Sequence, residues 1–345
     1  MSLSARSPET TRGSDRDFVR KLQLLVTVGV LPILLLLMIV IFGWMEPRFL
    51  NPANLINVLR QATFLAIVAM GQMLALVSGG FDLSVGAIVA LTSVIAALVM
   101  VSITGSGGSD LLALLAGSLA GLLTGLVFGL ANGLGVAVLR VSPFIVTLGT
   151  SSVIAGIALL QTGGAPIVGL PSIFVTSFGS NRIFGIPIVI YITAAVICVM
   201  YYLMNWSRFG RYIYAIGGNE NAARLSGIRV GRYLTSVYVV SGLLASLAGL
   251  LLTARVSAGE PNLGGPLAMQ SITAAVLGGT SLHGGEGKLG GVILGALFIA
   301  MLANGMNLIR VSSFWQMILL GCLLIFAVVV DRLRSRLTRS MDGKK

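Results

Sequence analysis

The chain has 345 residues, of which 56% are hydrophobic and only 10% are charged. Soluble domains carry about 25% charged residues, so a water-soluble protein could not cover this much apolar surface, and the composition indicates a membrane protein. The formal net charge of +12 does not indicate a nucleic-acid partner, because the basic residues cluster at the two ends and in one central loop.

Nine apolar runs follow one another along the chain, each long enough to cross the bilayer. About 20 residues of α-helix are needed to cross about 30 Å of hydrocarbon. The runs lie near 22–43, 54–78, 84–102, 111–139, 143–161, 187–204, 232–253, 288–309 and 312–330. A shorter run, 268–280, is flanked by glycine and proline and is either a tenth span or a re-entrant segment. We therefore predict an all-α, multi-pass membrane protein with about ten transmembrane helices, some of them broken or half-length.

These segments form one predicted transmembrane domain, residues 20–332, between a tail of residues 1–19 and a basic tail of residues 333–345. Ten spans place both tails on the same side. If that side is the cytoplasm, 18 of the 23 lysine and arginine residues lie inside and 5 outside. Cytoplasmic loops carry an excess of lysine and arginine, so we expect both termini in the cytoplasm.

The motif "GGFDLSVG" separates the second and third predicted spans. Its two glycines predict a sharp turn or a broken helix, and Asp82 is an acid at the membrane border. The Asp82 carboxylate is expected either to accept hydrogen bonds from the N–H groups that open the helix at Ser84, or to act in a hinge or pathway. We predict a turn with a gating role from these residues: Gly79, Gly80, Asp82, Leu83, Ser84 and Gly86.

The largest predicted inside loop, residues 205–233, contains a short helix signal. Asn219 can cap such a helix, Glu220 suits its first turn, Arg224 suits its last turn, and Gly227 can end it. The pattern alone favours a short solvated or interfacial helix that steadies the loop. The alternative is a docking helix for a cytoplasmic partner.

A second glycine loop, "GGTSLHGG", begins at Gly278 and shares the pattern G-G-x-x-L-x-x-G with the first motif, 199 residues earlier. Both copies lie on the inside in the predicted topology, which predicts a parallel repeat. The residues that we single out here are Gly278, Gly279, Thr280, Ser281, Gly284 and Gly285. His283 is expected to be an interfacial loop residue, because one histidine makes no metal site.

The sequence carries no motif for chemistry of its own. "GEGKL", beginning at Gly285, lacks the first glycine of a phosphate-binding loop and has Leu289 in place of Ser or Thr. No H-E-x-x-H or other metal-ligand cluster occurs, and Cys198 and Cys322 are interpreted as packing residues. We expect neither enzymatic activity nor a bound cofactor or metal.

Neutral polar residues are scattered through the predicted spans, whereas the acids lie at span ends, in loops and in tails. The acids therefore give little support to an ion-coupled carrier. The neutral groups could line a path for a polar solute, or could hold helices together. The candidates for the path are Gln61, Gln72, Asn132, Thr147, Asn304 and Asn307. The residues alone thus indicate a transporting membrane protein without an energy source of its own, and leave a passive channel open.

Four motifs, taken in order, resemble the permease subunits of bacterial ATP-binding-cassette (ABC) importers for ribose, xylose, arabinose and galactosides. The motifs are "SGGFDLSVGAIVAL", "YAIGGNENAARLSGI", "AAVLGGTSLHGGEGKLGGVILGAL" and "LANGMNLIRVSSFWQMILLGCLLIFAVVVDR". The resemblance covers nearly all of residues 20–332. Three residues differ from those common in the family's motifs, namely Phe81, His283 and Glu286. These differences affect the substrate assignment. Asp82 and the glycines of the motifs are all retained.

The resemblance implies a type II-like importer permease in the bacterial inner membrane, working as a homodimer or heterodimer among membrane lipids. A periplasmic sugar-binding protein would deliver the solute, and a separate ATPase subunit would bind ATP and magnesium. The ATPase would couple to the central loop, with Gly217 and Gly218 as an entry turn, through these residues: Asn219, Glu220, Asn221, Ala222, Ala223, Arg224, Leu225, Gly227 and Ile228. The expected solute is a monosaccharide such as ribose. The alternative solutes are inositol, an autoinducer sugar and a branched-chain amino acid. A less favoured alternative to the importer itself is an ion-coupled secondary carrier.

Overall fold

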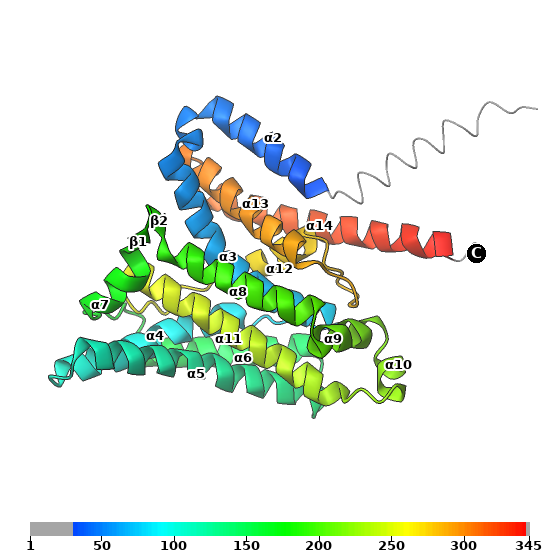
Figure 1. Ribbon diagram of the computed structural model, residues 1–345, viewed down its shortest axis with the longest axis horizontal. Coiled ribbons are helices and arrows are strands. Elements are labelled where there is room, and N and C mark those ends of the chain that lie inside the picture. The colour runs from blue at the N-terminus through cyan, green and yellow to red at the C-terminus, as the bar shows by residue number, and fades with distance from the viewer. Residues whose placement is uncertain (1–29, 343–345) are drawn as a thin grey trace, which may run out of the picture.

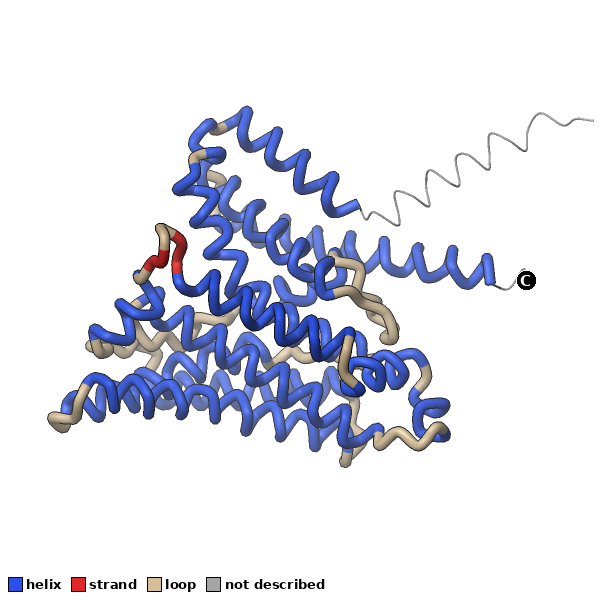
Figure 2. The backbone as a smooth tube through the Cα atoms, viewed as in Figure 1, coloured by secondary structure: helices blue, strands red, loops and turns tan. Residues whose placement is uncertain are grey.

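The computed structural model describes residues 30–342, so the predicted tail 1–19 and the start of the run 22–43 lie outside the described residues. Helices dominate the described part of the chain, and strand is confined there to one short hairpin (Figure 2). The first half contains α2 (Val30–Met45), η1 (Pro47–Leu50), α3 (Pro52–Val77), α4 (Val85–Gly105), α5 (Asp110–Ala137) and α6 (Pro143–Thr162). The connection to the second half contains α7 (Ser172–Phe174), η2 (Val175–Ser180), β1 (Arg182–Ile183) and β2 (Ile186–Pro187). The second half contains α8 (Ile188–Asn205), α9 (Arg208–Gly218), α10 (Glu220–Leu225), α11 (Val230–Val256), α12 (Leu267–Leu277), α13 (Leu289–Leu308) and α14 (Ser313–Asp342).

The predicted all-α membrane architecture is confirmed, with a helix at each of the ten predicted segments. Within the described residues, seven helices are long and apolar enough to cross a membrane, namely α3, α4, α5, α6, α8, α11 and α13. Three apolar segments are shorter: Leu31–Met45, Leu267–Leu277 and Ser313–Val329. The helices form a bundle with the β hairpin and α7 at one end and α9 and α10 at the other (Figure 1).

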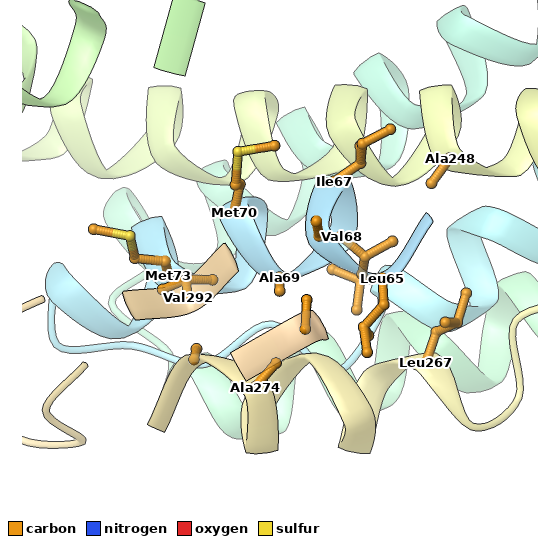
Figure 3. Packing of buried hydrophobic residues seen from close by; sticks show 14 of the residues in the cluster. Leu65, Ile67, Val68, Ala69, Met70, Met73, Ala248, Leu267, Ala274 and Val292 are labelled. Carbon is orange, nitrogen blue, oxygen red and sulfur yellow. The ribbon is translucent and has the colours of Figure 1, made fainter. Parts of the chain in front are cut away.

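Helix α3 is the centre of the bundle. It packs against α8, α11, α12 and α13, and 83% of its most apolar 18-residue window is buried, compared with 17% for α6. Figure 3 shows Ala69 and Met73 of α3 on the side of Ala274 and Val292. Helices α5, α6 and α14 carry many of the exposed large apolar side chains. A lipid environment would cover these outward faces.

Cys198 and Cys322 are both free and exposed on the surface of the bundle. The prediction that they pack inside it is therefore wrong. An apolar run in a membrane protein does not say which of its side chains face the protein, because the lipid-facing side is apolar too.

The crossing near 268–280 is neither a complete helical span nor a simple re-entrant hairpin. Helix α12 has 11 residues, or about 16 Å at 1.5 Å per residue, which is half of the hydrocarbon thickness. The preceding non-helical chain runs alongside α4, where Gly259 lies against Ser93 and Gly264 lies against the backbone of Gly86. This non-helical segment, which turns over residues 261–266, leads directly into the half-helix. Non-helical backbone is tolerated at membrane depth when protein surrounds it.

Candidate functional site

The turn after α3 is a glycine-dependent helix end. Ser78 follows the last helical residue, and Gly79 has a positive φ of +86° that a side chain would strain. The N–H of Gly79 donates to the Leu76 carbonyl (2.9 Å) and the N–H of Gly80 donates to the Ala75 carbonyl (2.8 Å). These bonds terminate α3 in a Schellman-type cap. The turn predicted from the two glycines is confirmed.

Asp82 is fully buried directly after this turn and accepts three hydrogen bonds. Its Oδ1 accepts from the backbone N–H (3.0 Å) and the hydroxyl (2.6 Å) of Ser84, and its Oδ2 accepts from the Ser241 hydroxyl (2.8 Å). The Asn132 amide donates to the Ser84 hydroxyl at 2.8 Å. The backbone hydrogen bond expected of Asp82 is therefore present, although Ser84 occupies the N-cap position of α4. The side-chain bonds join the start of α4 to α5 and α11.

Two further side chains hold the non-helical backbone around Asp82. The Tyr238 hydroxyl donates to the Phe81 carbonyl (3.3 Å), and the Leu83 N–H donates to the Thr147 hydroxyl (3.1 Å). Buried backbone polar groups need such partners. Tyr238 and Ser241 were not predicted from the sequence, because single polar residues inside a long, mostly apolar run carry no motif. The gating role assigned to this motif stays a prediction.

The six path candidates do not gather at one place. Asn132 and Thr147 belong to the Asp82 surroundings, while Asn304 of α13 exchanges amide hydrogen bonds of 2.9 and 3.0 Å with Asn54 of α3. The Gln316 amide donates to the side-chain oxygen of Asn307 at 2.7 Å. These hydrogen bonds hold helices together, which was the alternative to lining a path for a solute. The path role stays a prediction.

Gln61 and Gln72, the remaining path candidates, both lie on α3. Gln61 is half-buried, whereas Gln72 is fully buried. In the described part of the chain, neither polar atom of the Gln72 amide has a hydrogen-bond partner. An unsatisfied buried amide costs free energy, so Gln72 is the path candidate least explained by packing.

The central loop folds into two short helices. The Asn219 side chain caps α10 by accepting from the Ala222 N–H (3.0 Å), and Arg224 pairs with Glu220 at 2.6 Å. Gly227 has a positive φ of +83° just past the helix, as the sequence predicted. Exposure is high at the tip of the loop, where Leu225 is 90% exposed. The exposed members of the predicted coupling segment also include Glu220, Asn221, Ala222, Arg224 and Gly227, whereas Ala223 is buried and Ile228 is half-buried.

The prediction that Gly217 and Gly218 form an entry turn is wrong, because both belong to the last turn of α9. The lack of a side chain at Gly217 instead allows a close backbone contact. Gly217 lies so near the Val77 carbonyl and the Gly285 amide that a Cβ atom has no room, whereas the Cβ position of Gly218 is open. The glycine pair therefore forms the end of α9, where the backbone of Val77 and Gly285 packs against Gly217.

The second glycine loop repeats the geometry of the first. Helix α12 ends at Leu277, Gly279 has a φ of +87°, and its N–H donates to the Val276 carbonyl (2.9 Å). The Thr280 N–H donates to the Ala275 carbonyl (2.9 Å). Gly279 is thus the counterpart of Gly79, an offset of 200 rather than the 199 of the letter pattern. The sequence pattern aligns Gly279 with Gly80, because a pattern of residue types does not show where each helix ends.

The rest of this loop is held by its own backbone and by α13. Gly278 lies against Gly291 of α13, and the Ser281 N–H donates to the Glu286 carbonyl (3.0 Å). Gly284 and Gly285 both have positive φ, +84° and +74°. Such angles favour glycine, which explains the second glycine pair of the motif.

The three glycine-containing motifs meet at one end of the bundle, which we call the glycine junction (Val77, Gly79, Gly217, Gly284 and Gly285). The Gly285 N–H donates to the Val77 carbonyl at 2.8 Å, and Gly284 packs against Gly79 and Gly217. The Tyr214 hydroxyl of α9 donates to the Gly287 carbonyl at 2.7 Å. Segments separated by about 60 to 200 residues in the chain are therefore in direct backbone contact.

A cleft of about 720 Å³ opens beside the glycine junction. Gly79, Gly80 and Tyr238 line one side of it, and Glu220 and Arg224 of α10 line another. The exposed helix α10 and the turn in front of Asp82 thus border the same cleft. A partner that binds α10 would therefore sit at the edge of the cleft that the α3–α4 turn also lines.

Comparison with known proteins agrees with this arrangement. The family model described as "Branched-chain amino acid transport system / permease component" matches residues 54–328. The ribose import permease protein RbsC of Bacillus subtilis (strain 168) is 41% identical over 302 residues, which are 87% of this chain and 91% of that protein. RbsC of Escherichia coli (strain K12) is 40% identical, with coverage of 87% and 92%.

A third relative, the galactose/methyl galactoside import permease protein MglC of Escherichia coli (strain K12), is 35% identical, with coverage of 89% and 94%. No solved structure shows significant similarity to the chain. The family match extends from the start of α3 into α14 and includes every motif of the glycine junction. The chain is therefore a multi-pass membrane protein that belongs to the permease family of the branched-chain amino acid transport system type.

Proposed function

We propose that this chain is the membrane permease subunit of an ABC importer that moves ribose or a similar monosaccharide from the periplasm to the cytoplasm. The relatives named above are sugar import permeases, related over nearly the whole chain. The four motifs that resemble this class support the same proposal. The bacterial inner membrane is the corresponding location, with both termini in the cytoplasm.

The observation that carries the proposal is the backbone contact of Gly217, at the end of α9, with Val77 at the end of α3, beside a cleft that α10 and the turn in front of Asp82 both line. A separate ATPase subunit docks on α10, and ATP with magnesium binds to that subunit. Movement of α9 and α10 then reaches the end of α3 through Gly217, Val77 and Gly285. Packed backbones transmit displacement because packed protein interiors are hard to compress.

The remaining partners follow from the same proposal. A periplasmic sugar-binding protein delivers the solute at the opposite end of the bundle. A second permease subunit, which in a homodimer is a copy of this chain, completes the path. The exposed apolar faces of α5, α6 and α14 provide surface for both lipid and a second subunit.

The test is reconstitution in liposomes of this chain with its ATPase and binding protein. We expect ATP hydrolysis that is stimulated by the binding protein loaded with one monosaccharide, and no hydrolysis by the permease alone. The panel of solutes includes ribose, allose, galactose and inositol. Leucine is added because the family description names branched-chain amino acids. Solute uptake by the chain alone down an ion gradient would overturn the proposal.

A further inference from the structure

A second cleft, of about 730 Å³, lies between the start of α9 and the start of α11. We call it the arginine cleft. Arg208, Arg229 and Arg232 line it together with Tyr212 and Tyr233. The two tyrosine rings stand edge to face with centroids 5.0 Å apart, so they pack against each other on the wall of the cleft.

The three arginines have no ion-pair partner among the side chains that the structure describes. The ion pairs there are Glu46–Arg48 and Glu220–Arg224. All three side chains are exposed. Arginine presents planar, fixed N–H donors that match the oxygens of a phosphate group. The cleft therefore suits a phosphate-containing anion.

The surroundings place the arginine cleft at the membrane surface. Trp206, two residues before Arg208, is 70% exposed, and Tyr202 at the end of α8 is 62% exposed. Exposed tryptophan and tyrosine at helix ends are typical of the level of the lipid headgroups. Ser236 also lines the cleft, and it lies six residues, about 9 Å, along α11 from its start. The cleft thus extends from the interface toward the hydrocarbon region.

We propose that the arginine cleft binds the phosphate of an anionic phospholipid such as phosphatidylglycerol. The headgroup enters between α9 and α11, and the acyl chains lie against the exposed apolar side of α8, where Val199 is 58% exposed. Basic pockets between transmembrane helices on the cytoplasmic side bind anionic headgroups in this way. The bound lipid would support α9, the helix that ends at the glycine junction. The inference concerns a lipid site and does not depend on the transported solute.

The test measures lipid binding to the full chain purified in detergent, by native mass spectrometry with added phosphatidylglycerol or phosphatidylcholine. We expect one phosphatidylglycerol to remain bound to the unmodified protein and phosphatidylcholine to bind more weakly. The double variant Arg229→Gln/Arg232→Gln should bind phosphatidylglycerol about 30-fold more weakly, since each interfacial arginine contributes about fivefold. The control is Arg211→Gln, because Arg211 is exposed on α9 but does not line the cleft.

Several outcomes would overturn the proposal. Equal affinity of the double variant and the unmodified protein would exclude the cleft, and an equal loss in Arg211→Gln would indicate attraction by the whole surface. Displacement of the lipid by millimolar inorganic phosphate would assign the cleft to a soluble anion. If the double variant instead lost only the ATPase subunit in a pull-down, with lipid binding unchanged, the cleft would be part of a protein interface.

Discussion

Asp82 is stabilised by neutral partners, with no cation among its three hydrogen-bond donors. Asp82→Asn keeps an oxygen that can accept from Ser84, and the Ser241 hydroxyl can rotate to accept from the new amide. Asp82→Leu leaves buried donors without acceptors, at a cost of about 1–3 kcal/mol each. Thermal unfolding in detergent should therefore show a small loss for Asp82→Asn and a large loss for Asp82→Leu. Transport should follow the same order, and equal loss in both variants would indicate a role for the charge itself.

Gly217 and Gly218 form a matched pair for testing the glycine junction. Both lie in the last turn of α9, so alanine should improve helix propensity equally, by about 1 kcal/mol. Only Gly217→Ala meets the Val77 carbonyl, whereas the Cβ position of Gly218 is open. We expect Gly217→Ala to lose most of the coupling between ATP hydrolysis and uptake in proteoliposomes, and Gly218→Ala to keep it. Comparable activities of the two variants would show that the contact is not used.

At the scale of elements, α10 has two faces with different roles. Ala223 packs inward, while Leu225, Glu220 and Arg224 are exposed. Exposed ion pairs contribute about 0.3–0.5 kcal/mol to stability in a helix, so Glu220→Gln or Arg224→Gln should leave membrane insertion and thermal stability nearly unchanged. Uptake driven by ATP should nevertheless fall in both variants. Normal uptake would show that α10 is a short solvated helix that steadies the loop and does not dock a partner.

Leu225 tests the docking surface of the same element. A leucine that is 90% exposed at a loop tip gains free energy when a partner buries it, about 1.5–3 kcal/mol for full burial. Leu225→Ser should weaken the binding of the ATPase subunit by about tenfold or more, measured by surface plasmon resonance with the permease in nanodiscs. The control is Asn205→Ser, because Asn205 is exposed at the end of α8 and lies outside the predicted coupling segment, and this variant should bind normally. Equal binding of the two variants would place the interface elsewhere.

At the scale of the whole molecule, the arrangement of the ends predicts sidedness. With Cys198 and Cys322 first replaced by alanine, a membrane-impermeant maleimide should label Ser106→Cys, between α4 and α5, from outside spheroplasts. Asn221→Cys should be labelled only after the membrane is opened, because positive loops face the cytoplasm. Labelling in the reverse order would invert the proposed topology.

The positions of the apolar helices were predictable, because apolar runs of about 20 residues are typical of membrane spans. The helix end at Gly79 and the cap at Asn219 were predictable as well, since both depend on local backbone chemistry. The contact of Gly217 with Val77 was not, because the close approach of two distant backbones leaves no mark on either segment except a glycine. The partners of Asp82 were hidden for a similar reason, as Ser241 and Tyr238 lie in an otherwise apolar run.

The non-helical segment before α12 has a consequence for how the protein is made. Its backbone hydrogen-bonding groups depend on neighbours, such as the Ser93 hydroxyl that accepts from the Glu260 N–H at 3.0 Å, and Ile167, whose backbone pairs with Gly259. Hydrocarbon offers no such partners, so this stretch cannot enter the bilayer as an independent unit during synthesis. It can take its place only when α4 and the segment around Ile167 are there to pair with it. The part of the chain that leads into α12 is therefore placed by folding within the membrane and not by independent insertion.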